Sequence, residues 1–294
     1  MPVASPYAEQ LSRIPVVRAE IDVLGTPTAF WTYGPLDAET TILAVHGFRG
    51  DHHGLEPVVA HLPGIRVVMP DLPGFGETPP LPGRTLDLDA FAEWLTAFAA
   101  AAAPGAVVLG HSFGSIVAAA AVARGLPTPR LVLVNPIGAP ALEGPRGLLT
   151  RLAVLYYDAG ARLPEKLGTA ILRHPAIVRV MSIAMAKTRD RALRRWIHDQ
   201  HDRYFSGFAD RDALRDAFVT SVSHDVRASA PAVAQPTLLI AADRDDITPI
   251  EAERTLRGLF PDARLVEITG VGHLIHYEKP AEAAAAIRDF LAEG

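Results

Sequence analysis

The chain has 294 residues, of which 49% are hydrophobic and 21% are charged, and its formal net charge is −5. This is the composition of an ordinary globular protein with a large core, and it gives no indication of nucleic-acid binding. The chain contains no cysteine, which excludes disulfides, thiolate metal sites and thiol nucleophiles. We find no signal peptide and no span long enough to cross a membrane, and we therefore expect a cytoplasmic protein without stable membrane association.

Short apolar runs alternate with helical patterns over the first half of the chain. Two β-branched runs on either side of Gly25-Thr26-Pro27 predict an antiparallel hairpin, with strands at 16–22 and 28–33. Continuous apolar runs predict strands buried on both faces at 41–45, 66–69, 107–109 and 131–134. Helical spacing is found between them at 55–62 and 86–95. This alternation implies an α/β fold with a mostly parallel sheet flanked by helices.

The alternation stops between residues 137 and 230, where helical stretches follow one another without strand-like runs between them. The predicted helices there cover 148–157, 170–185, 191–205 and 212–221. The strand pattern returns at 236–241 and 263–268, with further helices predicted at 250–259 and 281–291. We therefore expect a helical insertion at 137–230 in a core formed by residues 1–136 and 231–294.

The apolar run at 107–109 leads into Gly110-His111-Ser112-Phe113-Gly114 and then into a helical stretch. A strand that feeds a helix through Gly-x-Ser-x-Gly is typical of a nucleophile elbow, a tight turn that presents its serine at the edge of the sheet. The serine takes a sparsely populated backbone conformation, and the two glycines leave space where a Cβ would collide. Ser112 is therefore the predicted nucleophile, with a helix N-cap as the alternative.

A serine hydroxyl needs a base to take its proton, and the base needs a group that orients it. His273 lies in the loop just beyond the last predicted strand, so it should lie at the same carboxyl-terminal edge as Ser112, although it could be a surface or capping histidine. Three carboxylates follow the preceding strand, and any of them could orient the base: Asp243, Asp245 and Asp246. Asn135 ends the strand after the elbow, but an amide cannot stabilise an imidazolium by charge.

Hydrolysis through a tetrahedral intermediate also needs hydrogen-bond donors for the negative oxygen. The backbone N–H of Phe113 lies directly after the serine, at the start of a predicted helix. The backbone N–H of Phe48 lies in the loop that follows the strand at 41–45. These two donors are the predicted oxyanion hole.

Together these motifs resemble those of the α/β-hydrolase superfamily, in the order in which that family uses them. They are His46-Gly47-Phe48, Asp71-Leu72-Pro73-Gly74-Phe75-Gly76, Gly110-His111-Ser112-Phe113-Gly114, Asp245 to Pro249 and Gly272-His273. The resemblance covers about residues 41–135 and 230–291 and implies an α/β-hydrolase core, with the insertion as a variable helical cap. In that family the acid stands four residues before a proline, which selects Asp245. The resemblance also implies that His46 and Asp71 hold the loops beside the site.

The neighbours of the predicted nucleophile and base separate the branches of this superfamily. Dehalogenases and epoxide hydrolases use an aspartate in place of Ser112, and carbon–carbon bond hydrolases usually have asparagine before the serine and tryptophan after the histidine. This chain has His111 and Leu274 at those two positions, and the His111 form is common among esterases and lipases of the monoacylglycerol type. The resemblance therefore favours a cofactor-independent serine hydrolase that cleaves a small, largely apolar carboxylic ester through an acyl-enzyme. A carbon–carbon bond hydrolase, a ligand-binding receptor that retains the triad, and a lyase or perhydrolase stay open as alternatives.

Several other motifs have a plainer interpretation. The histidines at 52–53 and 198–201 lack a convincing third ligand, so no metal site is predicted. The basic run at 187–195 could contact an acidic substrate, a membrane or RNA, but we favour the solvated face of a cap helix. The predicted substrate contacts are His111, Leu274, Tyr156 and Tyr157, although the tyrosines could equally pack the cap onto the core. We expect a small-molecule substrate, no nucleic-acid partner, and a monomer or small homo-oligomer.

Overall fold

The computed structural model describes residues 3–139 and 147–293, and its centre is one eight-stranded sheet. The strand order is β1-β2-β4-β3-β5-β6-β7-β8. The strands are β1 (Val16–Val23), β2 (Thr26–Tyr33), β3 (Thr41–Val45), β4 (Arg66–Pro70), β5 (Val107–His111), β6 (Leu131–Val134), β7 (Thr237–Ala242) and β8 (Ala263–Ile268). Strands β1 and β2 are antiparallel to their neighbours, and the other six run parallel. This confirms the predicted α/β fold with a mostly parallel sheet.

The central strands are apolar throughout because both of their faces are covered. In β5, Val108 belongs to one hydrophobic cluster, whereas Val107 and Leu109 belong to the cluster on the opposite face. Successive side chains of a strand point to opposite sides, so a doubly covered strand needs apolar residues at every position. The edge strand β1 is covered less completely, and Val16 and Val17 are each about half exposed.

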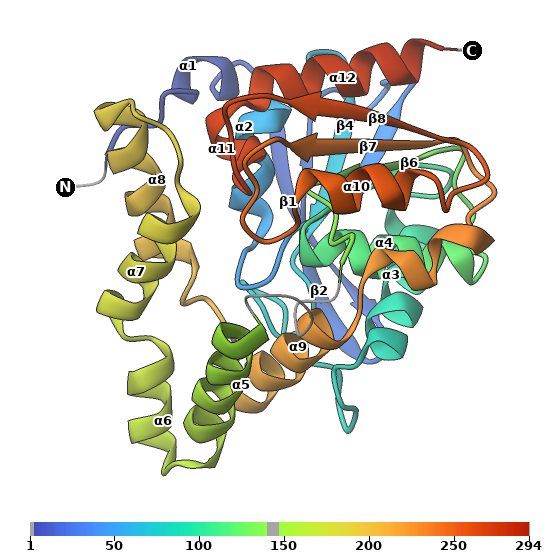
Figure 1. Cartoon of the computed structure of the whole chain (residues 1–294). Coiled ribbons are helices and arrows are strands. Elements are labelled where there is room, and N and C mark those ends of the chain that lie inside the picture. Colours follow the sequence, from blue (N-terminus) through green and yellow to red (C-terminus); the bar gives the residue numbers. More distant parts are fainter. Residues whose placement is uncertain (1–2, 140–146, 294) are drawn as a thin grey trace.

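Helices form the layers on the two faces (Figure 1). On one face, α3 (Leu88–Ala102) and α4 (Phe113–Ala123) enclose a cluster that includes Trp94 and Phe98. On the other face, α2 (Glu56–Val59) and α12 (Pro280–Ala292) pack against Ile42 and Ile240. Two further helices complete the core, α10 (Ile250–Arg257) and the short α11 (Ile275–Glu278), and a short helix α1 (Ala8–Leu11) precedes the sheet.

In the described part of the chain, five α-helices lie between β6 and β7 and gather beside the sheet (Figure 1). They are α5 (Gly147–Arg162), α6 (Glu165–Leu172), α7 (Pro175–Met185), α8 (Arg191–Tyr204) and α9 (Arg211–Ser223). Helix α5 packs against α6 and α9, and α7 packs against α8. These helices fall within the predicted insertion, although the division of the chain into core and cap at 137 and 230 stays a prediction. We call them the cap helices.

The predicted bounds of the helices at 55–62 and 170–185 were wrong. The single helix expected at 170–185 is divided between α6 and α7, because His174 is extended (ψ 121°) and Pro175 follows it. A residue before proline is disfavoured in the α conformation, so one helix must end and a new one begin there. The helix expected at 55–62 is a 3-10 turn, η1 (His52–Leu55), followed by the single turn of α2.

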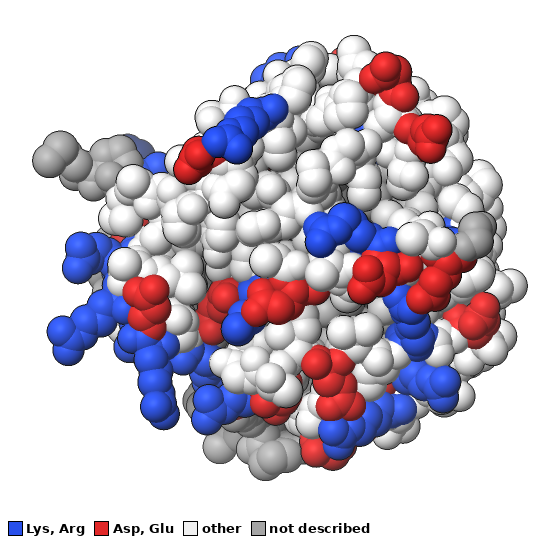
Figure 2. Space-filling view, turned by 90° about the horizontal axis from the view of Figure 1, so that it is seen from above, with Lys and Arg blue, Asp and Glu red and all other residues white. Residues whose placement is uncertain are grey.

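The surface carries charged side chains of both signs, and Figure 2 shows them interspersed over the face that holds α12. Several Lys and Arg side chains gather at the edge of this face on the side of α8. Exposed arginines on α8 are consistent with the prediction of a solvated basic face: they are Arg191, Arg194 and Arg195. Among the residues described, no helix is long and apolar enough to span a bilayer.

Candidate active site

The turn between β5 and α4 presents Ser112 in the conformation that the sequence predicts. Ser112 has φ 53° and ψ −119°, a left-handed backbone conformation that is costly for a residue with a side chain. A Cβ on Gly110 would clash with the carbonyl of Gly114, and a Cβ on Gly114 would clash with the carbonyl of Val45. The two glycines therefore allow the strand and the helix to approach closely enough for this turn to form.

Three residues from distant parts of the chain meet at the carboxyl-terminal edge of the sheet. The Oγ of Ser112 lies 2.7 Å from Nε2 of His273, and Nδ1 of His273 lies 2.8 Å from Oδ2 of Asp245. The side chains of His273 and Asp245 are both buried. The loops after β5, β7 and β8 thus bring a hydroxyl, an imidazole and a carboxylate into one hydrogen-bonded series.

The environment of Asp245 favours its ionised form. Burial opposes ionisation, but the ring of His273 and the backbone N–H groups of Ile247 and Thr248 hold the pKa of Asp245 below its ordinary value. Oδ1 accepts those two hydrogen bonds at 2.7 Å and 3.3 Å. The amide of Asn135 donates to Oδ2 at 3.1 Å, so Asn135 contacts the acid rather than replacing it.

The two other acids in this loop have different partners. Asp243 accepts a hydrogen bond from the backbone N–H of Gly270 at 2.8 Å. Asp246 forms an ion pair with Lys187, in the linker between α7 and α8. Of the three candidate carboxylates, the structure therefore places only Asp245 against His273.

The loop after β3 lies beside the serine. A Cβ on Gly47 would lie 3.2 Å from Cβ of Ser112, so the backbone of this loop passes directly next to the predicted nucleophile. Phe48 follows in the same loop, and Phe113 opens the first turn of α4, where backbone N–H groups lack helical acceptors. Within the described residues, no backbone acceptor is found for the N–H of Phe48 or Phe113.

Buried polar groups hold the neighbouring loops, as the resemblance implied for His46 and Asp71. Nε2 of His46 accepts a hydrogen bond from the N–H of Leu72 at 2.9 Å, and burial lowers the pKa of His46, which keeps its ring neutral. Asp71 accepts from the N–H of His52 at 2.9 Å and from the N–H of Glu77 at 2.8 Å. The loops after β3 and β4 are thus fixed to each other.

Arg49 is a buried residue of this region that the sequence analysis missed. Its guanidinium donates to the carbonyl of Phe205 at 2.8 Å, to the carbonyl of Leu172 at 2.9 Å and to the hydroxyl of Tyr157 at 3.1 Å. All three acceptors belong to the cap helices or to the residue that follows α8. Arg49 thereby joins the Phe48 loop to the cap, and no local sequence pattern indicates so distant a set of partners.

A cavity of about 160 Å³ adjoins the serine. Its walls are mostly apolar, and they include the predicted contacts His111 and Leu274 together with Phe48. Met181 and Met185 extend into its wall from α7. Burial lowers the pKa of His111 to about 3, with a further contribution from His273, so the ring of His111 stays uncharged at neutral pH.

Tyr156 and Tyr157, the other predicted contacts, do not belong to the described wall of this cavity. Tyr157 stacks on Phe218 with ring centroids 4.0 Å apart, and the hydroxyl of Tyr156 donates to the carbonyl of Ile171 at 3.0 Å. These contacts agree with the alternative interpretation, in which the tyrosines pack the cap, and their contact with a substrate stays a prediction.

The histidine pairs set aside as metal ligands are engaged in other contacts. His52 stacks on Trp31 and hydrogen-bonds Asp71, and His198 and His201 both contact the hydroxyl of Ser182. Among the residues that the structure describes, no group of three or more potential ligands could hold a metal ion.

The sheet, the elbow and the order of the loops define a class, and comparison with known families agrees. The model of the alpha/beta hydrolase fold family matches residues 40–280, and the chain belongs to that family.

Its relatives include esterases. The chain is 26% identical over 276 residues to a pimeloyl-[acyl-carrier protein] methyl ester esterase of Xanthomonas axonopodis, covering 92% of this chain and 98% of that one. It is 27% identical over 268 residues to the biotin biosynthesis bifunctional protein BioHC of Cellvibrio japonicus, covering 85% of this chain but only 47% of that protein. A solved esterase from Thermogutta terrifontis superposes with a TM-score of 0.73 at 23% identity, over 94% of this chain and 98% of that one.

Proposed function

We propose that this protein is a serine hydrolase that cleaves a small, largely apolar carboxylic ester through an acyl-enzyme. The observation that carries the proposal is the series of contacts from Ser112 through His273 to Asp245. A hydroxyl, an imidazole and a carboxylate in this order are the groups that nucleophilic acyl transfer needs. Membership of a hydrolase family with esterase relatives supports the same reaction type.

In the first half of the reaction, Oγ of Ser112 attacks the ester carbonyl while Nε2 of His273 takes the hydroxyl proton. The resulting imidazolium is stabilised by Asp245, whose low pKa keeps it negative. His273 then gives the proton to the leaving alkoxide, and the acyl group stays on Ser112. In the second half, His273 takes a proton from water, the hydroxide attacks the acyl-enzyme, and Ser112 recovers its proton as the acid leaves.

We assign stabilisation of the negative oxygen, which forms in both halves of the reaction, to the backbone N–H groups of Phe48 and Phe113. Both lie in backbone segments next to Ser112, and Phe113 adds the positive end of the α4 dipole. Donors fixed by the backbone need no reorganisation as charge develops, and the loss of one such donor typically lowers the rate by about 10²-fold or more.

The apolar wall of the cavity supports an apolar substrate, and its size supports a small acyl or alcohol group next to the serine. We assign the choice of substrate to the cap, because α7 contributes Met181 and Met185 to that wall. Methionine adapts its shape to different partners, which suits a pocket that accepts related apolar groups.

A fluorophosphonate probe tests the nucleophile, because it labels only an activated serine. We expect the wild-type protein to be labelled and the Ser112→Ala variant to remain unlabelled and inactive on 4-nitrophenyl esters. Ser115→Ala is the matched control, since Ser115 lies in the same turn but its hydroxyl donates to the carbonyl of Ser112. Labelling that persists in Ser112→Ala would refute the assignment.

A further inference from the structure

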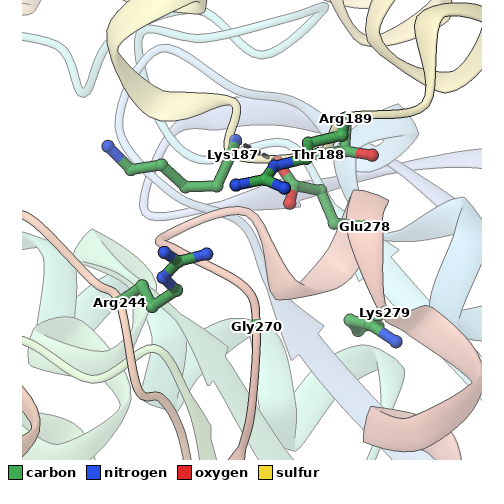
Figure 3. A pocket seen from close by; sticks show the side chains of 7 residues that line it. All are labelled: Lys187, Thr188, Arg189, Arg244, Gly270, Glu278 and Lys279. Carbon is green, nitrogen blue, oxygen red and sulfur yellow. Dashed lines mark hydrogen bonds between the residues drawn. The ribbon is translucent and has the colours of Figure 1, made fainter.

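A second pocket lies at the junction between the cap helices and the core. It has a volume of about 370 Å³, and one side is formed by residues 187–189, in the linker between α7 and α8. The other side is formed by Arg244 and Gly270 from the loops after β7 and β8, and by residues 278–279 at the end of α11 (Figure 3).

Two of the four cations in this pocket have ion partners among the described residues. Lys187 pairs with Asp246, and Lys279 pairs with Glu282 at 2.8 Å. Within the described part of the chain, no ion pair is found for Arg189 or Arg244, and both are exposed. Figure 3 shows both guanidinium groups directed toward the space between the linker and the core loops.

The single acid in the pocket wall already has other contacts. Glu278 accepts a hydrogen bond from the backbone N–H of Lys187 at 2.6 Å, and this bond fixes the linker to α11. Burial raises the pKa of Glu278, although nearby N–H groups and cations oppose the shift. The pocket therefore presents two uncompensated guanidinium groups on a chain whose overall charge is −5.

The pocket adjoins the catalytic loops. Arg244 directly precedes Asp245, and its N–H donates to the carbonyl of Val271 at 3.1 Å. The side chain of Lys187 covers Gly272, since a Cβ there would lie 2.7 Å from Lys187 Cγ. Met185 and Ile247 line the cavity at Ser112, whereas their near neighbours Lys187 and Asp246 form the ion pair beside this pocket. The cavity and the pocket thus adjoin along the same two segments, the linker after α7 and the loop after β7.

We propose that the pocket binds an anionic group, a carboxylate or a phosphate, at the far end of a substrate whose ester bond lies at Ser112. Planar guanidinium groups bind both kinds of oxyanion through paired hydrogen bonds, which makes two free arginines a suitable receptor. The inference rests on the proposed function and narrows its substrate class to esters with an apolar segment at the serine and a negative charge beyond it.

A matched set of esters tests this inference. Three series of 4-nitrophenyl esters are compared over a range of acyl chain lengths. Their acyl chains end in a methyl group, a carboxylate or a phosphate, and esters of equal length are compared with one another. For the preferred charged ester, we expect Arg189→Gln and Arg244→Gln each to raise KM about tenfold, with kcat little changed. The two charged series decide which oxyanion the pocket prefers.

Arg195→Gln is the control, because Arg195 is exposed on α8 but does not line the pocket. The quantity compared is kcat/KM for the charged ester divided by kcat/KM for the uncharged ester. Arg195→Gln should leave this ratio within twofold of the wild-type ratio. In the wild-type protein, 0.5 M salt should lower the ratio because it screens the charges. The proposal is overturned when Arg189→Gln and Arg244→Gln, like Arg195→Gln, keep this ratio within twofold of the wild-type ratio. It is also overturned when no charged ester is hydrolysed more efficiently than its uncharged counterpart.

Binding measured without turnover separates this proposal from the proposed function. Calorimetric titration of Ser112→Ala with a dicarboxylate half ester, or with the phosphate-ended ester, should give a site that disappears in the Ser112→Ala/Arg189→Gln/Arg244→Gln variant. Binding without any hydrolysis by the wild-type protein would support the pocket and contradict the hydrolase. Hydrolysis without such binding would support the hydrolase and contradict the pocket.

Discussion

The rim of the sheet and the cap differ in how firmly their residues are held. At the rim, Ser112, His273 and Asp245 extend from loops that directly follow parallel strands, and they touch one another at 2.7 Å and 2.8 Å. The cap helices bury their apolar side chains less completely, and five of the large apolar side chains described there are at least half exposed: Leu152, Leu155, Leu167, Val180 and Ile183. The groups proposed for chemistry thus belong to a closely packed part of the molecule, whereas the groups proposed for substrate choice belong to helices that bury their apolar side chains less completely.

From this contrast we expect the proposed reaction and its proposed specificity to respond to different substitutions. A substitution at the rim alters distances in a hydrogen-bonded series, where small displacements are costly. A substitution in α7 alters the shape of an apolar wall, where methionine side chains can adjust. The following predictions test this division.

The largest effect is expected within the acid loop. Asp245→Asn should lower kcat about 10³-fold or more, because an amide in its place cannot stabilise the imidazolium and favours the wrong tautomer of His273. The matched variants are Asp243→Asn and Asp246→Asn, which change the same kind of side chain in the same loop. Both should retain kcat within about tenfold on an uncharged ester, and equal losses in all three variants would contradict the assignment of Asp245.

An intermediate effect is expected at Arg49, where the rim and the cap are joined. Arg49→Met keeps an unbranched side chain but leaves the carbonyls of Leu172 and Phe205 without their donor. We expect a loss of about 2–4 kcal/mol in the free energy of unfolding, because each bond to a charged donor contributes about 1.5–3 kcal/mol and the buried charge is removed at the same time.

Chemical denaturation of Arg49→Met, Arg49→Lys and the exposed control Arg191→Met measures this effect. Lysine retains the charge without the fork of donors, so Arg49→Lys should fall between wild type and Arg49→Met. A free energy of unfolding for Arg49→Met equal to that of Arg191→Met would show that Arg49 does not hold the cap.

The smallest effect is expected at Asp51, near the cavity, and it depends on pH. Burial and the negative charge of Asp71 raise the pKa of Asp51 to about 6, although His52 and His53 oppose the shift. The folded protein therefore holds this proton more tightly than the unfolded chain does. The free energy of unfolding should fall as the pH rises from about 4 to about 6. Above pH 6 it should not fall further on account of Asp51, because the carboxyl group is then ionised in both the folded and the unfolded protein.

Asp51→Asn removes this titration but keeps an oxygen that can accept the hydrogen bond from the N–H of His53. We expect the variant to gain on the order of 1–2 kcal/mol relative to wild type between pH 4 and pH 7. Urea unfolding at a series of pH values measures the difference, and parallel stability curves for the two proteins would contradict the prediction.

The same contrast explains what could be predicted from the sequence. The strands could be predicted because each is a short apolar run, and Ser112 and His273 could be predicted because each lies in the loop or turn after such a run. The choice of Asp245 among three acids needed a family resemblance, since nothing local shows that Asp243 contacts Gly270 or that Asp246 contacts Lys187. In the cap, helical periodicity indicated helices but not their partners, so the packing of Tyr157 and the contacts of Arg49 stayed hidden.

The contacts of Arg49 also restrict how the cap can move. They hold the carboxyl-terminal ends of α6 and α8, together with Tyr157 of α5, close to the Phe48 loop. Met181 and Met185 of α7 are not among these partners, although they cover the cavity. The position of the Phe48 N–H, the proposed oxyanion donor, therefore depends on contacts with α5, α6 and the end of α8 rather than on the methionines of α7.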